Sequence, residues 1–250
     1  MPEISVVIIT HNEEANIQRC LDSVQGIATE IVVVDSFSTD NTGAICESSG
    51  CRVYRREFTG YGDQKQFATD QASNDWIFSI DADEVVSAEL REEISEWRQD
   101  AGCKVAGYRI PFSLCFMERI LKHSGVGNEF HLRFFDRNRG NFTTVQVHEG
   151  VELRGNAGTL KGKIIHYSYC NITHHLEKIN TYTSQAAAEN VGKGRKYSKC
   201  WVGFKFPISF FTVYFHKGGI LDGYPGFVWS FFAAFYASLK IAKTIELTKP

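Results

Sequence analysis

The chain has 250 residues, of which 43% are hydrophobic and 22% charged, and a formal net charge of −2. This length suits one large domain, or one domain with a substantial appendage, and the near-neutral charge argues against general affinity for nucleic acid. The seven cysteines are odd in number and lack CxxC or CxxxH spacing, which argues against a disulfide framework or a zinc site. No basic segment precedes an apolar stretch at the amino terminus, so we expect no secretory signal and a cytoplasmic active part.

Short apolar runs alternate with helix-like stretches through the first 84 residues. The sequence predicts strands at residues 4–9, 31–34, 52–54 and 76–80. These runs are continuous and largely β-branched, which is typical of parallel strands buried on both faces. A helix is expected to begin at residues 10–14 and to end near Val24. The alternation predicts an α/β fold with a mostly parallel, Rossmann-like sheet flanked by helices.

Polar clusters follow three of these strands, at residues 10–14, 35–42 and 81–84. Ligands of parallel sheets bind beyond the carboxyl ends of the strands, where these clusters would meet. Asp81 and Asp83 are expected to fall on one side of the chain, roughly 7 Å apart, because strand side chains alternate. A divalent cation such as Mg²⁺ or Mn²⁺ would reverse the repulsion between two such carboxylates. Taken alone, the tripeptide Asp81-Ala82-Asp83 is equally well explained by a solvated acidic turn.

The alternation stops after Glu84. An exposed helix is predicted over residues 87–99, and strand-like segments follow at 105–111, 130–135 and 163–167. We expect residues 1–170 to form the catalytic domain. Its nucleotide-binding half would cover residues 1–100 and its acceptor half residues 101–170.

Residues 171–250 are expected to form a helical, aromatic-rich extension that associates with a membrane. Between Glu189 and Asp222 there is no acidic residue, whereas basic and aromatic residues interleave, a pattern that favours an anionic membrane surface. The uncharged stretch Gly223–Leu239 has 17 residues, and a bilayer span needs about 20 predominantly apolar ones. We favour a helix lying in the membrane interface. A core helix packed against the sheet and a spanning helix are the alternatives.

With these residues in view, the chain resembles glycosyltransferase family 2, the inverting nucleotide-sugar transferases of GT-A (nucleotide-diphospho-sugar transferase) fold. Its second half resembles the bacterial branch named for lipopolysaccharide-core glucosyltransferases. The segments that carry the resemblance are 4–14, 30–36 with Ser38, Asp40 and Thr42, 81–84, 132–135, 147–149, 166–169 and 217–223. They run nearly from end to end of the chain.

The resemblance implies a donor site. Its donor-binding residues would be Thr10, Asn12, Glu13, Asp35, Ser36, Lys65 and Asp81. Asp35 would accept a hydrogen bond from the base, commonly uracil in this family, because an ionised carboxylate only accepts. Lys65 would offset diphosphate charge, and an ordinary exposed lysine is the alternative. Asp81 would hold the sugar–ribose side.

The resemblance also implies a metal cofactor and an acceptor site. Asp83 would bind Mg²⁺ or Mn²⁺ directly, with Asp81 and His166 as further ligands. A buried histidine bonded to the backbone is the alternative for His166. The acceptor-binding residues would be His123, Arg133 and His148, although surface salt bridges explain such residues equally well.

Inverting transfer needs a general base that takes the proton of the attacking hydroxyl. Many family members carry an acidic pair where this chain has His148 and Glu149. Glu149 is therefore the expected base, and Asp136 is the alternative. His148 departs from the family pattern and could bind metal or orient the glutamate.

The sequence thus predicts a metal-dependent, inverting hexosyltransferase with a nucleotide-sugar donor, UDP-linked by preference. Its acceptor would be a lipid-anchored glycan such as the lipopolysaccharide core, reached from a peripheral position on the cytoplasmic face of the inner membrane. A sugar nucleotidyltransferase is the weaker alternative, because residues 10–19 contain no glycine for a triphosphate-binding loop. A non-catalytic nucleotide-binding membrane scaffold would lack one of the chemical groups named above.

Overall fold

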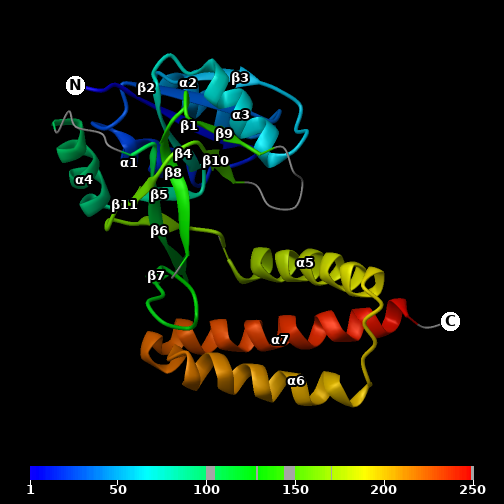
Figure 1. The fold of residues 1–250 in the computed structure, drawn as a ribbon. Helices are drawn as coiled ribbons and strands as arrows, with labels where there is room; N and C mark the ends of the chain where they lie inside the picture. Colours follow the sequence, from blue (N-terminus) through cyan, green and yellow to red (C-terminus); the bar gives the residue numbers. More distant parts are fainter. Residues whose placement is uncertain (100–104, 128, 144–149, 170, 249–250) are drawn as a thin grey trace. The chain divides into compact units, whose positions relative to one another are not determined.

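The protein was analysed as a computed structural model that describes residues 1–99, 105–127, 129–143, 150–169 and 171–248. The chain forms two compact units (Figure 1). The sheet unit comprises Met1–Ser113 and Asn128–Tyr167, and the helical unit comprises Leu114–Gly127 and Ser168–Pro250. The helical unit therefore includes a short segment that lies far from its helices in the sequence.

The sheet unit holds the alternating strands and helices. Its helices are α1 (Ile17–Val24), α2 (Thr42–Ser48), α3 (Tyr61–Gln71) and α4 (Ala88–Gln99). Its strands are β1 (Ile4–Thr10), β2 (Glu30–Asp35), β3 (Arg52–Arg55), β4 (Trp76–Asp81), β5 (Glu84–Val86), most of β6 (Gly107–Phe116), β8 (Phe130–Asp136), β9 (Gly140–Phe142), β10 (Val151–Leu153), β11 (Ala157–Thr159) and β12 (Ile164–His166). The sheet has the order β3-β2-β1-β4-β8-β6-β12-β5.

The first four strands of this order are parallel, and β8 joins β4 in the antiparallel sense. In the parallel register Thr10 lies opposite Asp35, and Ile9 lies opposite Asp81. The carboxyl ends of β1, β2 and β4 therefore meet at one edge. The expected parallel α/β architecture is confirmed, and so is the meeting of its polar clusters.

Alternate residues of the central strands pack on opposite faces of the sheet. Val6, Ile8 and Phe78 are buried against α1, whereas Val7 and Val32 are buried on the face that Ala68 of α3 covers. Each fully buried aliphatic or aromatic side chain of this kind contributes about 1.5–3 kcal/mol. The continuous apolar runs of the sequence follow from this burial on both sides.

The segment after β1 differs from its expected helical conformation, because α1 begins only at Ile17. The backbone N–H groups of Asn12, Glu13 and Glu14 instead donate to the side chains of Ser38, Thr42 and Asp40, over 2.8, 2.8 and 3.1 Å. These bonds replace those of a first helical turn. The loop after β1 is thus tied to the loop after β2.

The helical unit is built around its last helix. Its elements are the β7 strand (Arg119–Ile120), which pairs with the end of β6, α5 (Ile172–Gly192), α6 (Cys200–Phe211), the π-helical turn η1 (Thr212–His216), the 3₁₀ turn η2 (Gly219–Asp222) and α7 (Gly223–Leu247). Helix α7 packs against both α5 and α6 (Figure 1). Small residues on α7, Gly226, Ser230 and Ala234 among them, are buried and permit close helix approach. In the described part of the chain, no helix has both the length and the apolar composition that are needed to cross a bilayer.

An aromatic cluster encloses His175 of α5 in the helical unit. The ring centroid of His175 lies 4.1 Å from that of Tyr169, 4.8 Å from Phe232, 5.3 Å from Phe116 and 5.5 Å from Trp229. Burial, aided by the charge of Lys178, lowers the pKa of His175 to about 4. The imidazole is therefore neutral in the folded protein at neutral pH.

This burial predicts a loss of stability in acid. In the unfolded chain His175 binds a proton near pH 6.5, whereas the folded protein resists protonation down to about pH 4. Stability that is present above pH 6.5 is therefore lost as the pH falls through this window, by about 3 kcal/mol in all. Urea unfolding at pH 7.5, 6.0, 5.0 and 4.0 measures the loss. His175→Phe should lose correspondingly less stability, whereas the exposed-site control His216→Phe should follow the wild type. Equal losses for His175→Phe and wild type would contradict the assignment.

Candidate active site

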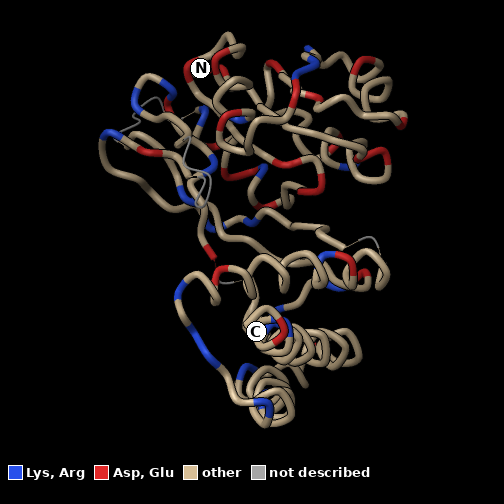
Figure 2. The backbone as a smooth tube through the Cα atoms, turned by 90° about the vertical axis from the view of Figure 1, so that its right-hand side faces the viewer, with Lys and Arg blue, Asp and Glu red and all other residues tan. Residues whose placement is uncertain are grey.

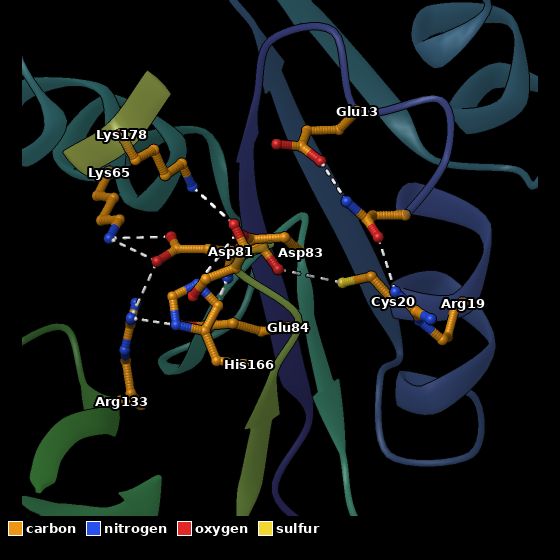
Figure 3. A network of polar contacts seen from close by, with 12 residues as sticks. Glu13, Arg19, Cys20, Lys65, Asp81, Asp83, Glu84, Arg133, His166 and Lys178 are labelled. Atoms are coloured by element: carbon orange, nitrogen blue, oxygen red, sulfur yellow. Dashed lines mark hydrogen bonds and ion pairs between the residues drawn. The ribbon is translucent and has the colours of Figure 1, made fainter. Parts of the chain in front are cut away.

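Two cations hold the carboxylate of Asp81 at the end of β4 (Figure 3). Lys65 of α3 places Nζ 2.9 Å from Asp81 Oδ1, and Arg133 of β8 places Nη2 3.0 Å from Oδ2. The same Arg133 nitrogen lies 3.0 Å from Oε1 of Glu84, whose Oε2 accepts the backbone N–H of Asp81 over 2.8 Å. The Lys65 side chain is only 4% exposed, which rules out the alternative of an ordinary exposed lysine.

The pKa values of the two carboxylates in this cluster, Asp81 and Glu84, are shifted in opposite directions. Burial opposes ionisation of Asp81, but Arg133 and Lys65 hold its pKa far below the usual range. Burial raises the pKa of Glu84 to about 7 although Arg133 lowers it, and the charge of Asp81 adds to the rise. At neutral pH Asp81 is therefore fully charged, and Glu84 is partly protonated.

Asp83 contacts a different partner. Strand β4 ends at Asp81 and the chain turns, so strand alternation does not extend to Asp83 as the sequence suggested. The Nε2 of His166 lies 3.0 Å from Asp83 Oδ2, and His166 is paired with Glu84 across the β12–β5 ladder (Figure 3). His166 thus bonds a carboxylate rather than the backbone. Burial lowers its pKa, but the hydrogen bond and charge of Asp83 outweigh burial and raise it.

The Asp83–His166 pair fits part of a metal site. No group of three or more His, Cys, Asp or Glu side chains among the described residues is placed to hold an ion. Neighbouring ligands in an octahedral site with bonds of about 2.1 Å lie roughly 3 Å apart, as do the facing atoms of Asp83 and His166. Mg²⁺ usually takes one or two protein ligands and completes its shell with water and substrate phosphate oxygens. Asp81, by contrast, is already neutralised by its two cations.

The loops after β1 and β2 form the other side of this sheet edge. Asn12 has a positive φ of 54° and accepts the Thr39 N–H at its Oδ1 over 2.8 Å. Asp35 is 1% exposed, and its carboxylate accepts the N–H and the hydroxyl of Ser38. The buried hydroxyl of Thr10 has no hydrogen-bond partner within the described part of the chain. Asp35 is therefore engaged by its own loop before any ligand binds.

Glu13 and Ser36, which the sequence predicts to bind the donor, also lie at this edge of the sheet. The carboxylate of Glu13 accepts Nδ2 of Asn16 over 2.8 Å, and the hydroxyl of Ser36 accepts Nε2 of Gln64 over 3.0 Å. The backbone N–H of Ser36 donates to Thr10 O over 2.9 Å. The structure thus brings the donor-site residues onto the edge where Asp81 ends β4.

A cavity of about 1030 Å³ opens in the sheet unit beside the Lys65–Arg133 pair. Its lining includes Lys65, Arg109, Phe130, His131, Leu132, Arg133, Phe142, Gly150, Val151, Leu153, Asn156 and Thr159. The lining is mainly polar, with Lys65, Arg109 and Arg133 as its basic residues, and none of its described residues is acidic. The guanidinium of Arg109 is exposed and has no ion-pair partner among the residues described. Such a cavity can take a sugar with an anionic substituent.

Asp136 is misplaced for the role of alternative base. The β4–β8 register pairs Asp136 with Trp76, at the opposite end of β4 from Asp81. Five residues of strand separate these two ends by roughly 16 Å. Asp136 therefore lies away from the Asp81 cluster, because β8 runs antiparallel to β4. His123 lies in the helical unit, and His148 and Glu149 lie outside the described residues.

Sequence reasoning missed two residues. Glu84 belongs to the polar cluster at residues 81–84, but the sequence predicts no binding or catalytic role for it. In the structure it forms an ion pair with Arg133. Arg109 was missed because no motif surrounds it, and only the folding of β6 places it at the cavity. The position of Glu84 next to Asp83 was a signal that the sequence offered. For Arg109 the sequence offered no such signal.

Comparison with known proteins places this geometry in context. The profile described as Glycosyl transferase family 2 matches residues 5–161. The lipopolysaccharide core biosynthesis glycosyltransferase LpsC of Rhizobium meliloti is 34% identical over 250 residues, which cover 97% of this chain and 92% of LpsC. An uncharacterized glycosyltransferase of Rickettsia typhi is 32% identical over 261 residues, covering 99% and 88% of the two chains.

A solved structure shows the fold. The crystal structure of S. aureus TarS 1-349 superimposes with a TM-score of 0.50 at 17% identity, over 74% of this chain and 65% of that chain. This likeness concerns the fold alone. It agrees with the GT-A architecture that the sequence predicted, which is confirmed.

The ion-pair cluster predicts an unequal response to the loss of arginines. Arg133→Met leaves the buried carboxylates of Asp81 and Glu84 with one fewer cation, so it should lower the free energy of unfolding by about 3 kcal/mol. Urea unfolding at pH 7 measures this change. The control Arg52→Met removes an exposed arginine that pairs with Glu30 and should change stability little. Equal effects of the two substitutions would contradict a buried cluster.

Proposed function

The chain belongs to glycosyltransferase family 2 and is a glycosyltransferase, and from this premise we propose that it transfers a sugar with inversion from a UDP-linked donor. The transfer uses Mg²⁺ or Mn²⁺, and the acceptor is a lipid-anchored glycan such as the lipopolysaccharide core. The observation that carries the proposal is the pairing of Asp83 with His166 beside the Lys65–Asp81–Arg133 cluster.

The donor nucleotide lies along the edge formed by β1, β2 and β4. Asn12, Asp35 and Ser36 come from two loops that hydrogen bonds hold together, so the pocket is largely formed before the donor arrives. Asp35 accepts the imide N–H of uracil when it releases Ser38, since an ionised carboxylate can only accept. Thr10 offers a buried hydroxyl with unused bonding capacity.

Asp83 and His166 are the residues that hold the metal. When bound, the ion supplies Lewis-acid stabilisation of the departing diphosphate. Lys65 and Arg133 keep Asp81 charged and contribute positive charge on the same side. Asp81 so held orients the ribose and sugar hydroxyls of the donor by accepting their hydrogen bonds.

The acceptor occupies the basic, mainly polar cavity. Arg109 presents an exposed guanidinium group that suits a phosphate or carboxylate substituent of a glycan, and Arg133 lies in the same lining. Glu149, which precedes the cavity-lining Gly150 in the chain, is the general base that takes the proton from the acceptor hydroxyl. His148 is proposed to orient that glutamate.

The helical unit brings the enzyme to the cytoplasmic face of the membrane. Trp201, Phe204, Ile208, Phe211 and Phe215 are exposed and recur at helical spacing along one face of α6 and η1. The opposite side of α6 packs on α7 through pairs such as Phe206–Phe231. A helix that is apolar on both sides requires a second apolar environment. Figure 2 shows basic residues along the segment that joins α5 to α6, and no acid occurs between Glu189 and Asp222. Helix α6, rather than α7, is therefore the proposed interfacial helix.

The metal assignment predicts the behaviour of two substitutions. Asp83→Asn and His166→Gln should each lower manganese-dependent turnover of the UDP-sugar at least about a hundredfold, because a ligand to the ion is lost. Calorimetry should show weaker Mn²⁺ binding in the presence of UDP. The control Asp75→Asn, at an exposed acid before β4, should behave as wild type. Full metal-dependent turnover in Asp83→Asn would exclude this residue as a ligand.

The base assignment predicts a separate effect on catalysis. Glu149→Gln should lower kcat by about 10²–10⁴-fold, the typical contribution of general base catalysis, with little change in UDP affinity. Asp136→Asn serves as control and should retain turnover, because it lies at the far end of β4. Rapid-quench transfer assays measure kcat. If Glu149→Gln transfers sugar at the wild-type rate, the base is another group.

A further inference from the structure

The segment Lys217–Gly223 has no part in the proposed sugar transfer, although its sequence Lys-Gly-Gly-Ile-Leu-Asp-Gly is distinctive. In the structure it connects η1 to α7 and includes η2. It contacts the β6–β7 hairpin and the loop that follows β7, all within the helical unit (Figure 1).

Asp222 fixes the loop after β7. Its Oδ1 accepts the backbone N–H of Lys122 over 3.0 Å, and its Oδ2 accepts the N–H of His123 and the hydroxyl of Ser124 over 3.1 and 2.8 Å. The side chain is almost completely buried. The carboxylate of Asp222 thus bonds two backbone N–H groups and one hydroxyl. The side chains of Lys122 and His123 stay exposed.

Three glycines with positive φ each lie against a basic side chain. A Cβ at Gly223 would lie 3.3 Å from Nη1 of Arg119, and one at Gly218 would lie 3.5 Å from the ring of His123. A Cβ at Gly125 would lie 2.7 Å from Nζ of Lys217. Glycine is suited to such positions because it adopts positive φ without strain and leaves room for a close neighbour. Only at Gly125 does the absence of a Cβ make room for a basic group, that of Lys217, whereas the contacts at Gly218 and Gly223 are ordinary or slightly tight.

Arg119 and His123 help to line a hollow of about 410 Å³, called here the headgroup hollow. Its lining consists of Glu118, Arg119, Ile120, Lys122, His123, Leu221 and Asp222. Among these residues, Arg119 and Lys122 carry positive charge, and Glu118 is the exposed acid. Since the carboxylate of Asp222 is buried and bonded, the exposed charges of the hollow are two positive ones and that of Glu118, which leaves an excess of one positive charge for an anionic group.

Exposed apolar residues lie beside the basic ones. Leu221 is 66% exposed and Ile120 is 37% exposed, and Ile220 and Met117 are exposed nearby in the chain. Met117 and Glu118 both have positive φ, as a two-residue type I′ hairpin turn requires, although neither is a residue that favours it. Apolar tips beside basic groups are typical of surfaces that lie at a lipid–water interface.

We propose that the headgroup hollow binds the phosphate of an anionic phospholipid, with Arg119 and Lys122 as its ligands. Ile120 and Leu221 enter the acyl boundary beside that phosphate. A lipid is favoured over a soluble phosphate because the exposed apolar residues adjoin the basic ones. The inference rests on the proposed membrane association and adds to it a defined contact with a defined lipid group.

Vesicle sedimentation with the full chain tests this assignment. Wild type should bind vesicles of phosphatidylglycerol and phosphatidylcholine and bind pure phosphatidylcholine much less. Arg119→Gln/Lys122→Gln should lower the partition coefficient on the anionic vesicles about tenfold or more, the effect of two basic residues at such a surface. The matched control Lys161→Gln/Lys163→Gln removes two exposed charges from the sheet unit and should bind as wild type. Leu221→Ser should also weaken binding, although it changes no charge.

The outcomes separate the site from the rest of the proposal. If wild type binds the anionic vesicles and Arg119→Gln/Lys122→Gln binds them equally well, the hollow is not the lipid site, and the membrane association itself stands. If the control loses as much affinity, only net charge matters and the site is overturned. Complete competition by millimolar glycerol phosphate would assign the hollow to a soluble phosphate and overturn the lipid assignment. Turnover of the UDP-sugar is measured separately and does not enter this test.

Discussion

One carboxylate at the end of a buried strand, neutralised by two cations from other elements, determines the geometry of the site. Asp81 belongs to β4, Lys65 to α3 and Arg133 to β8, so their ion pairs join the parallel and antiparallel parts of the sheet. Removing charges from water is costly unless partners and hydrogen bonds compensate, and here Arg133 serves Glu84 as well. Asp83 lies outside this cluster and is bonded to His166 instead.

Much of the parallel half was predictable because its determinants are local. Continuous apolar runs specified β1, β2 and β4, and parallel packing alone carries their polar ends to one edge. The helix expected from residue 10 was wrong because three backbone N–H groups found side-chain acceptors about 26 to 29 residues away. Local propensity contains no information about such partners.

The remaining site depended on contacts that single motifs do not encode. The position of Asp136 follows from the antiparallel register of β8, which the sequence does not reveal. Likewise, Glu84 gained its role through Arg133, 49 residues further along the chain. In the helical unit, composition indicated a basic and aromatic surface, but only packing shows that α7 contacts both α5 and α6 while α6 keeps an exposed aromatic face.

The mutual bonding of the two loops at the donor edge has a consequence for engineering. Asn12 donates its backbone N–H to Ser38 and accepts the N–H of Thr39 at its side chain. The backbone N–H groups of Glu13 and Glu14 donate to the side chains of Thr42 and Asp40. The loop after β1 takes most of these bonds from the loop after β2, which also has bonds of its own between Asp35 and Ser38. A chimera that grafts one loop alone from a relative would therefore lose the bonds between the loops, whereas exchanging the two together would keep them.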